Sequence, residues 1–284
     1  MITGFDHIAL AVRDLDAVQA RFEALLGRTP EWVGADGGAR HAWFQLDNMA
    51  LDVIAPTGPG LTGDQITAHL HAHGEGIWAV AFAAPALEKA RRLLANRGLN
   101  PSDIGRIRAT REGGTEKRYW TMATLPLNDL AGLRAFLIDA AANFDWPKAS
   151  RTAEPAIAGL DHLVVRTPAP ERALALYGAR LGLDLRLDRT HSEWGARLQF
   201  FRCGDAILEI AHGLGQAGDG PDSLWGLSWR AEDADAAHAR IVAAGFDCSE
   251  VRTGRKPGTR VFTVRDAPAG IPTIVVQPPS RAEQ

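Results

Sequence analysis

The sequence has few of the features that mark disulfide-stabilised, nucleic-acid-binding or membrane proteins. Its 284 residues include only two cysteines, Cys203 and Cys248, and their positions predict neither a disulfide nor a zinc ribbon. The formal net charge is -3, so there is no basic excess to neutralise phosphates. No apolar run approaches the roughly 18 residues of a membrane span. The chain opens on a strand pattern without a secretory signal, and we expect a cytoplasmic location.

Several catalytic motifs are also missing. No Gly-x-Ser-x-Gly elbow, phosphate-loop lysine motif or Cys-x-x-Cys pair occurs, which removes support for a serine hydrolase, a nucleotidase or a zinc ribbon. Residues 213–218 (GLGQAG) fit a dinucleotide fingerprint, but the sequence after them predicts a strand where a helix N-terminus would be needed. We therefore expect no nucleotide cofactor.

What the chain does contain is an internal repeat. Residues 2–7 (ITGFDH) recur 155 residues later as 157–162 (IAGLDH), and residues 51–53 (LDV) recur as 208–210 (LEI). A second pair of segments matches at a different offset, residues 77–79 (IWA) with 224–226 (LWG). The chain thus has the order A-B-A′-B′, which indicates a duplication of a two-module unit.

Each module has the same predicted plan, a strand, a helix and three further strands. In module A, alternating apolar residues predict a strand at 5–12, and a helical pattern covers 17–26. Asp14 is the expected N-cap of that helix and Gly27 its expected C-cap. The fold class expected is therefore α+β: four βαβββ modules forming two paired, curled mixed sheets with helices outside.

The proline-containing segment 146–155 predicts an extended linker between two halves. We place an N-terminal domain at 1–145, with modules at 1–58 and 74–145. A C-terminal domain follows at 156–284, with modules at 156–213 and 222–279. Two curled sheets that face one another would leave a concave cleft suited to a small ligand.

These motifs resemble the vicinal oxygen chelate superfamily, which includes glyoxalases, bleomycin-resistance proteins and extradiol dioxygenases. The resemblance is carried by residues 5–12 (FDHIALAV), 74–82 (GEGIWAVAF), 160–165 (LDHLVV) and 208–210 (LEI). It covers nearly the whole chain and is closest to four-module, glyoxalase-like members. It implies a cleft between modules in which a small oxygenated metabolite binds.

The resemblance also implies a set of metal ligands. Metal-using members bind a divalent ion through a His on the first strand and a carboxylate on the last strand of each module. In modules A and A′ these positions hold His7, Asp52, His162 and Glu209. Imidazole and carboxylate together suit Zn, Ni, Fe or Mn, which would act as a Lewis acid on the substrate.

Modules B and B′ depart from that pattern. The position of the first-strand His is Ala79 in B and Gly226 in B′, and the last strand of B′ has no carboxylate. Either modules A and A′ face each other and share one complete shell, or metal binding is lost. Because relatives pair modules within each half, we favour loss or a weak site, and the cofactor is either a divalent metal or none.

Aromatic and basic residues on predicted strands are candidates for substrate binding. They are Arg40, Trp43, Trp78, Arg118, Trp120, Arg197 and Trp225. The indoles could stack on a planar ligand and the guanidinium groups could pair with an anion, although core packing and exposed strand edges explain the same residues. His69, His71 and His73 fit the solvated end of a helix that enters a Gly-rich turn.

Three functions remain open at this stage. One is a glyoxalase-like lyase, isomerase or dioxygenase in which His7 or His162 is a ligand or general base. Another is a metal-free protein that sequesters a small molecule, as bleomycin-resistance proteins do, and a third is a scaffold without catalysis. We expect a small-molecule ligand, no nucleic-acid or membrane partner, and allow for a homodimer.

Overall fold

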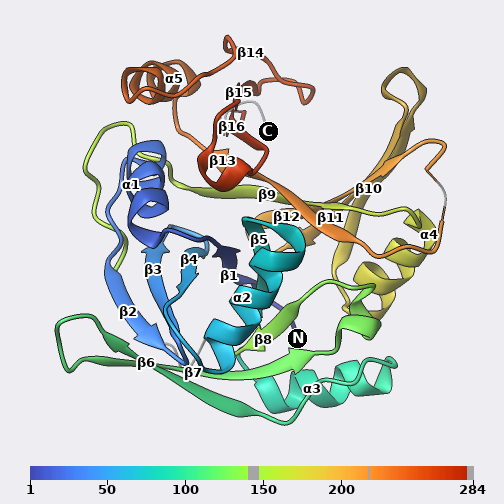
Figure 1. Cartoon of the computed structure of the whole chain (residues 1–284). Helices are drawn as coiled ribbons and strands as arrows, with labels where there is room; N and C mark the ends of the chain where they lie inside the picture. The colour runs from blue at the N-terminus through green and yellow to red at the C-terminus, as the bar shows by residue number, and fades with distance from the viewer. Residues whose placement is uncertain (140–146, 217, 280–284) are drawn as a thin grey trace.

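The computed structural model describes residues 1–139, 147–216 and 218–279, which form two sheets of eight strands (Figure 1). The elements of the N-terminal half, in order, are β1 (Gly4–Ala11), α1 (Leu15–Leu26), β2 (Trp32–Asp36), β3 (Ala39–Gln45), β4 (Ala50–Pro56), α2 (Leu61–His73), β5 (Gly76–Ala83), α3 (Leu87–Asn96), β6 (Gly105–Arg111), β7 (Lys117–Leu125), a 3₁₀ turn (Leu127–Leu130) and β8 (Ala135–Ile138).

The C-terminal half repeats this plan with a less regular helix. Its elements are β9 (Gly159–Arg166), α4 (Pro170–Ala173) continued by a π-helical segment (Leu174–Arg180), β10 (Asp184–His191), a 3₁₀ turn (Ser192–Trp194), β11 (Ala196–Cys203), β12 (Ala206–Gly213), β13 (Ser223–Arg230), α5 (Ala234–Ala243), β14 (Arg252–Thr253), β15 (Arg260–Val264), a second 3₁₀ turn (Pro268–Gly270) and β16 (Thr273–Gln277). None of the helices in the described ranges is long and apolar enough to cross a membrane.

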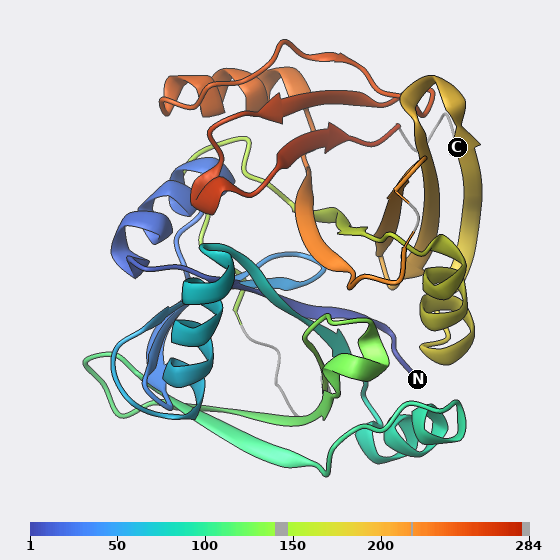
Figure 2. The same ribbon diagram turned by 45° about the vertical axis from the view of Figure 1, so that its right-hand side comes forward.

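The modules pair within each half. The N-terminal strands close into a barrel in the order β1-β4-β3-β2-β6-β7-β8-β5, so modules A and B share one sheet. The C-terminal strands form a sheet in the order β10-β11-β12-β9-β13-β16-β15-β14. The predicted α+β fold with two curled sheets is confirmed, and Figure 2 shows the two halves packed against each other.

Local sequence explains the first helix. The Asp14 side chain accepts a hydrogen bond from the Ala17 backbone N–H at 3.0 Å, which satisfies one of the unpaired donors at the helix start. Gly27 ends the helix in the left-handed region at φ 66°, where a side chain would be strained. Both predicted caps are confirmed.

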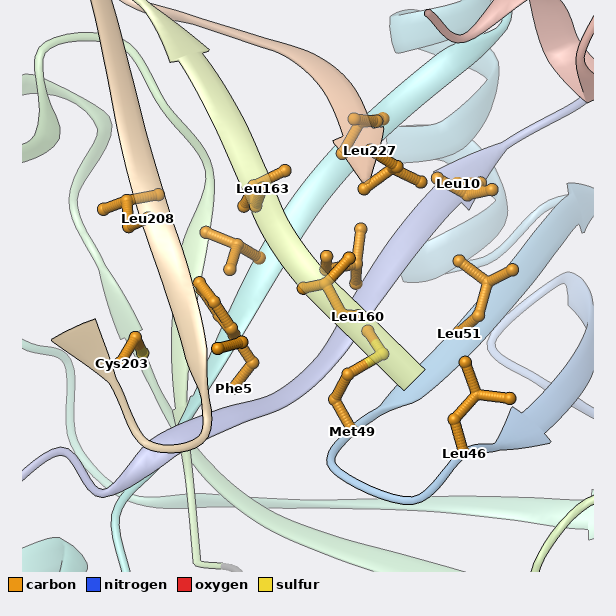
Figure 3. Packing of buried hydrophobic residues seen from close by; sticks show 14 of the residues in the cluster. Phe5, Leu10, Leu46, Met49, Leu51, Leu160, Leu163, Cys203, Leu208 and Leu227 are labelled. Carbon is orange, nitrogen blue, oxygen red and sulfur yellow. The ribbon is translucent and has the colours of Figure 1, made fainter. Parts of the chain in front are cut away.

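One hydrophobic core joins the two halves. Phe5, Ile8 and Leu10 of β1 pack in the same cluster as Leu160 and Leu163 of β9 (Figure 3). Successive side chains of a strand point to opposite faces, so His7, next to Ile8, and His162, next to Leu163, lie on the faces turned away from this core. The joint between the sheets therefore separates the two histidines.

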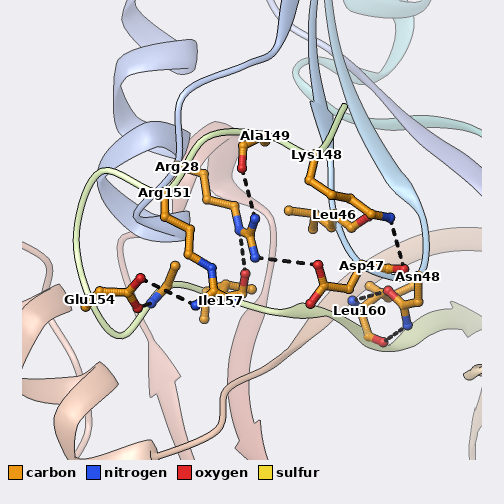
Figure 4. A network of polar contacts seen from close by, with 11 residues as sticks. Arg28, Leu46, Asp47, Asn48, Lys148, Ala149, Arg151, Glu154, Ile157 and Leu160 are labelled. Carbon is orange, nitrogen blue, oxygen red and sulfur yellow. Dashed lines mark hydrogen bonds and ion pairs between the residues drawn. The ribbon is translucent and has the colours of Figure 1, made fainter. Parts of the chain in front are cut away.

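A polar network fastens the segment that connects the halves. The buried Arg28 side chain donates hydrogen bonds to the carbonyl of Ile157 at 2.8 Å and to that of Ala149 at 2.9 Å (Figure 4). Asn48, in the β3–β4 turn, exchanges two hydrogen bonds with the Leu160 backbone, at 2.7 and 3.0 Å. These bonds fix the start of β9 against module A.

Helix α2 lies against the barrel at the β2–β3 turn. A side chain at Gly63 would meet the carbonyl oxygens of Gly38 and Gly58 at 2.3 and 2.4 Å, so only glycine allows this close approach. Ile66 and Leu70 pack with Ile54 and Trp78 of the barrel. The helix thereby forms part of the wall of the cavity described next.

Candidate functional site

The barrel of the N-terminal half encloses a cavity of about 320 Å³. Its apolar lining includes Trp43, Trp78 and Trp120, with Phe136 beside them, and its polar lining includes His7. A cavity of this size, largely aromatic with a few polar groups, is typical of a site for a small molecule.

The strand order places unlike side chains on facing walls. In the closed ring of eight strands, three strands lie between β3 and β8 in either direction, so the two strands lie across the barrel from each other. The β2–β4 wall carries Asp36, His41 and Asp52, whereas the β5–β7–β8 wall carries Trp78, Trp120 and Phe136. The cavity therefore has an ionic wall and an aromatic wall.

The ionic wall is a carboxylate–imidazole–carboxylate chain. The His41 Nδ1 atom donates to Asp52 at 3.0 Å and its Nε2 atom donates to Asp36 at 2.9 Å. Burial lowers the pKa of His41, but the charges and hydrogen bonds of Asp52 and Asp36 outweigh burial and raise it to about 10. His41 is thus an imidazolium at neutral pH, and the three groups together carry a charge of about -1.

His7 is the second histidine of the cavity lining, and it pairs with Asp6. Its Nδ1 atom lies 2.6 Å from Oδ1 of Asp6, and its ring is 4.8 Å from that of Trp43. An ionised carboxylate accepts the Nδ1 hydrogen, which leaves Nε2 as the basic nitrogen of the neutral ring. His7 lines the cavity, so this nitrogen is placed to exchange a proton with a bound ligand.

Arg134, just before β8, is the cation of the opposite wall. Its guanidinium lies 5.0 Å from the centre of the Trp78 ring, and its Nη1 atom donates to Gln65 of α2 at 3.4 Å. Burial lowers the pKa of this guanidinium. No carboxylate among the residues that the structure describes forms an ion pair with it.

In the C-terminal half, His162 is the repeat equivalent of His7 and lies between two acids. His162 has its Nδ1 atom 2.9 Å from Asp161 and its Nε2 atom 3.4 Å from Glu209. Burial raises the pKa of Glu209, although the charges of His162 and Arg255 oppose this. The Asp-His pair is therefore repeated in the second half, where it contacts Glu209 directly.

The structure brings together some of the predicted residues and separates others. His7, Asp52, Trp43, Trp78 and Trp120 line one cavity. His162 and Glu209 lie in the other sheet, so the four predicted metal ligands do not share one shell. The alternative in which modules A and A′ share one metal shell is wrong, because A forms a barrel with B and A′ a sheet with B′. Modules A and A′ contact each other through the apolar faces of β1 and β9.

Four predicted substrate residues lie outside the cavity lining, each with another partner. Arg40 pairs with Asp16 and Glu112, and Arg197 pairs with Asp188 and Glu171. Arg118 is buried against Glu31 at 3.1 Å, and Trp225 is exposed with the guanidinium of Arg166 4.0 Å from its ring centre. A role of these side chains in substrate binding remains a prediction.

The donor set around the predicted ligands does not fit a resident divalent ion. Both oxygens of Asp52 are within 3.2 Å of the His41 nitrogen, and a protonated imidazole cannot coordinate a metal. Across the described ranges no three His, Cys, Asp or Glu side chains are grouped to hold a metal ion.

The fold and cavity define a protein of paired βαβββ modules. A family model described as the Glyoxalase/Bleomycin resistance/Dioxygenase superfamily matches residues 6–116, and a second model of the same description matches residues 159–272. The chain belongs to this superfamily, with one such domain in each half. A comparison with curated proteins found no match.

Solved structures share the whole fold at low sequence identity. A mutant of 4-hydroxymandelate synthase from Streptomyces coelicolor has a TM-score of 0.72 at 15% identity, covering 98% of this chain and 93% of that one. A Mn(II)-bound glyoxalase from Novosphingobium aromaticivorans has a TM-score of 0.65 at 16% identity, with 97% and 82% covered. BphC, a halotolerant catechol dioxygenase, has a TM-score of 0.62 at 14% identity, with 98% and 87% covered.

Proposed function

We propose that this protein is a glyoxalase-like protein that binds a small oxygenated metabolite in the cavity between modules A and B. The supporting observation is the closed barrel, whose lumen of about 320 Å³ is lined by three indole rings and by His7. Aromatic rings offer flat apolar contact, while the few polar groups fix the orientation of a ligand. The structural neighbours that act on oxygenated compounds have the same fold.

The chemistry proposed for this site is proton transfer by His7. Asp6 holds the Nδ1 hydrogen, so the Nε2 atom would take a proton from an acidic C–H or O–H of the ligand. Such a step serves a lyase or an isomerase, two of the three enzyme classes expected from the resemblance, the third being a dioxygenase. A role for Zn, Ni, Fe or Mn stays a proposal that the donor set around Asp52 does not support.

Binding is tested by titrating 2-naphthol, a neutral planar hydroxyl compound, while following tryptophan fluorescence. We expect saturable binding by the wild-type chain and at least tenfold weaker binding by Trp78→Leu, because burial of one aromatic face is lost. Trp194→Leu is the matched control, since that indole is exposed in the C-terminal half. Absence of saturable binding, or equal affinity in Trp78→Leu, would contradict the proposal.

Catalysis is tested separately from binding. A compound that binds in the fluorescence titration, starting with 2-naphthol, is incubated with the wild-type chain and with His7→Gln, and its consumption is followed by NMR. An enzyme converts the compound, whereas His7→Gln binds it without turnover. A compound recovered unchanged from the wild-type chain would favour sequestration.

A further inference from the structure

The arginines of this chain are paired almost wherever they are buried. Arg118 donates to Glu31 at 3.1 Å, and Arg240 donates to three backbone carbonyls at 2.6 to 2.9 Å. Arg134 differs, because within the described part of the chain its guanidinium makes one hydrogen bond, at 3.4 Å to the amide oxygen of Gln65. A half-buried guanidinium with several unused donors costs desolvation energy that a ligand oxygen would recover.

The position of Arg134 is fixed by the sheet. Its backbone carbonyl accepts a hydrogen bond from Val80 of β5 at 3.1 Å, and its guanidinium lies over the Trp78 ring. The ring and the amide of Gln65 hold the guanidinium at the cavity wall without neutralising its charge. A fork of N–H donors held this way is suited to a carboxylate.

A second unused donor lies beside it. The Nε1 atom of Trp78 is buried and has no hydrogen-bond partner among the described residues. Buried polar groups are normally paired, so an acceptor on a ligand that reaches this indole N–H would satisfy it. Arg134 and Trp78 thus offer donors on the same wall.

The opposite wall restricts what else the ligand can carry. Asp36 and Asp52 flank His41 there, and their net negative charge would repel a second anionic group. The same carboxylates would accept a hydrogen bond from a hydroxyl. Arg106, the other arginine of the lining, is exposed and lies 4.1 Å from the Tyr119 ring centre.

Building on the proposed function, we infer that Arg134 is the carboxylate-binding residue of the cavity and that the ligand is a planar organic monocarboxylate. Its carboxylate would bind the β8 wall, its ring would lie against Trp78 and Phe136, and a neutral or hydrogen-bond-donating end would face Asp36 and Asp52.

The experiment compares 2-naphthoate with 2-naphthamide, which has the same shape without the charge. Isothermal titration is carried out with the wild-type chain, with Arg134→Met, which keeps the apolar stem, and with Arg106→Met as the matched control. We expect the wild-type chain and Arg106→Met to prefer the carboxylate by at least about tenfold. Arg134→Met should lose this preference while its affinity for the amide changes less than about twofold, and Arg134→Lys should restore part of it.

The outcomes separate the inference from the proposed function. Equal binding of both probes by the wild-type chain overturns the inference but leaves the cavity as a binding site. A preference that persists in Arg134→Met, or that disappears in Arg106→Met, also overturns it. If neither probe binds the wild-type chain, both the inference and the proposed function fail.

Discussion

The imidazole Nδ1 atom of His41 donates a hydrogen bond to Oδ2 of Asp52 at 3.0 Å. Asp52 is one of the carboxylates predicted to bind a metal. In the structure, the protonated imidazole of His41 occupies that position beside it. Since Asp36 holds the other ring nitrogen, the imidazolium is fixed between two buried acids. A buried charge supplied by a side chain replaces the one that a metal would bring.

The first prediction concerns how much the Asp36–His41–Asp52 ion pairs contribute to the free energy of unfolding. His41→Gln removes the cation and leaves two carboxylates buried near each other, so we expect a loss of about 3–5 kcal/mol in the free energy of unfolding. His212→Gln is the control, because His212 is buried and its ring hydrogen-bonds the backbone carbonyl of Thr167 at 3.0 Å, with no ion pair to an acid among the described residues. Its loss should be about 1 kcal/mol in urea titrations. Equal losses would mean that His41 is not a buried cation.

The pH dependence of stability should have a definite sign. The folded pKa of His41, about 10, lies above its ordinary value of 6.5, so its stabilisation is complete below about pH 6.5 and is lost as the pH rises towards 10. Unfolding free energies of the wild-type chain and of His41→Gln, measured at pH 6 and pH 9.5, should differ most at pH 6. A gap that grows with pH would contradict this assignment.

Metal binding gives a third prediction. After dialysis against EDTA, titration with Zn²⁺, Ni²⁺ or Mn²⁺ should show no stoichiometric micromolar site, because His41 occupies the oxygens of Asp52. The titration is best done in His73→Ala, since the rings of His69 and His73 are 5.0 Å apart on α2 and could chelate ions at the surface. One bound ion per chain that disappears in Asp52→Asn would refute the prediction and revive the metalloenzyme hypothesis.

Repetition in the sequence was enough to predict the modules. The recurrence of the Asp-His pair, together with local signals such as Asp14 and Gly27, indicated both the βαβββ unit and its duplication. The residues alone did not decide which modules pair, because that choice depends on how much apolar surface β1 and β9 bury between the sheets. Pairing within each half was expected from the resemblance. Helix α2 was recognised only at its histidine end, and its role as a cavity wall follows from contacts distant in sequence.

The residues of the cavity were predicted in part. Trp43 and Asp52 are cross-strand partners, and His41, two residues before Trp43, faces the same side of β3. That alternation could have identified His41. Arg40 was predicted instead, but its side chain points the other way and pairs with Asp16 and Glu112. Asp36 could not have been found without the β2–β3 register.

The last prediction concerns the joint between the halves. Arg28→Met would leave the carbonyls of Ala149 and Ile157 without their buried donors, so we expect a loss of about 2–4 kcal/mol in the free energy of unfolding. Arg151→Met is the matched control in the same network (Figure 4), because Arg151 and Glu154 are exposed and 3.4 Å apart. Such a surface pair contributes less than about 1 kcal/mol. Urea unfolding of both variants measures the difference, and a loss in Arg28→Met no larger than in Arg151→Met would show that the connection relies on the apolar core alone.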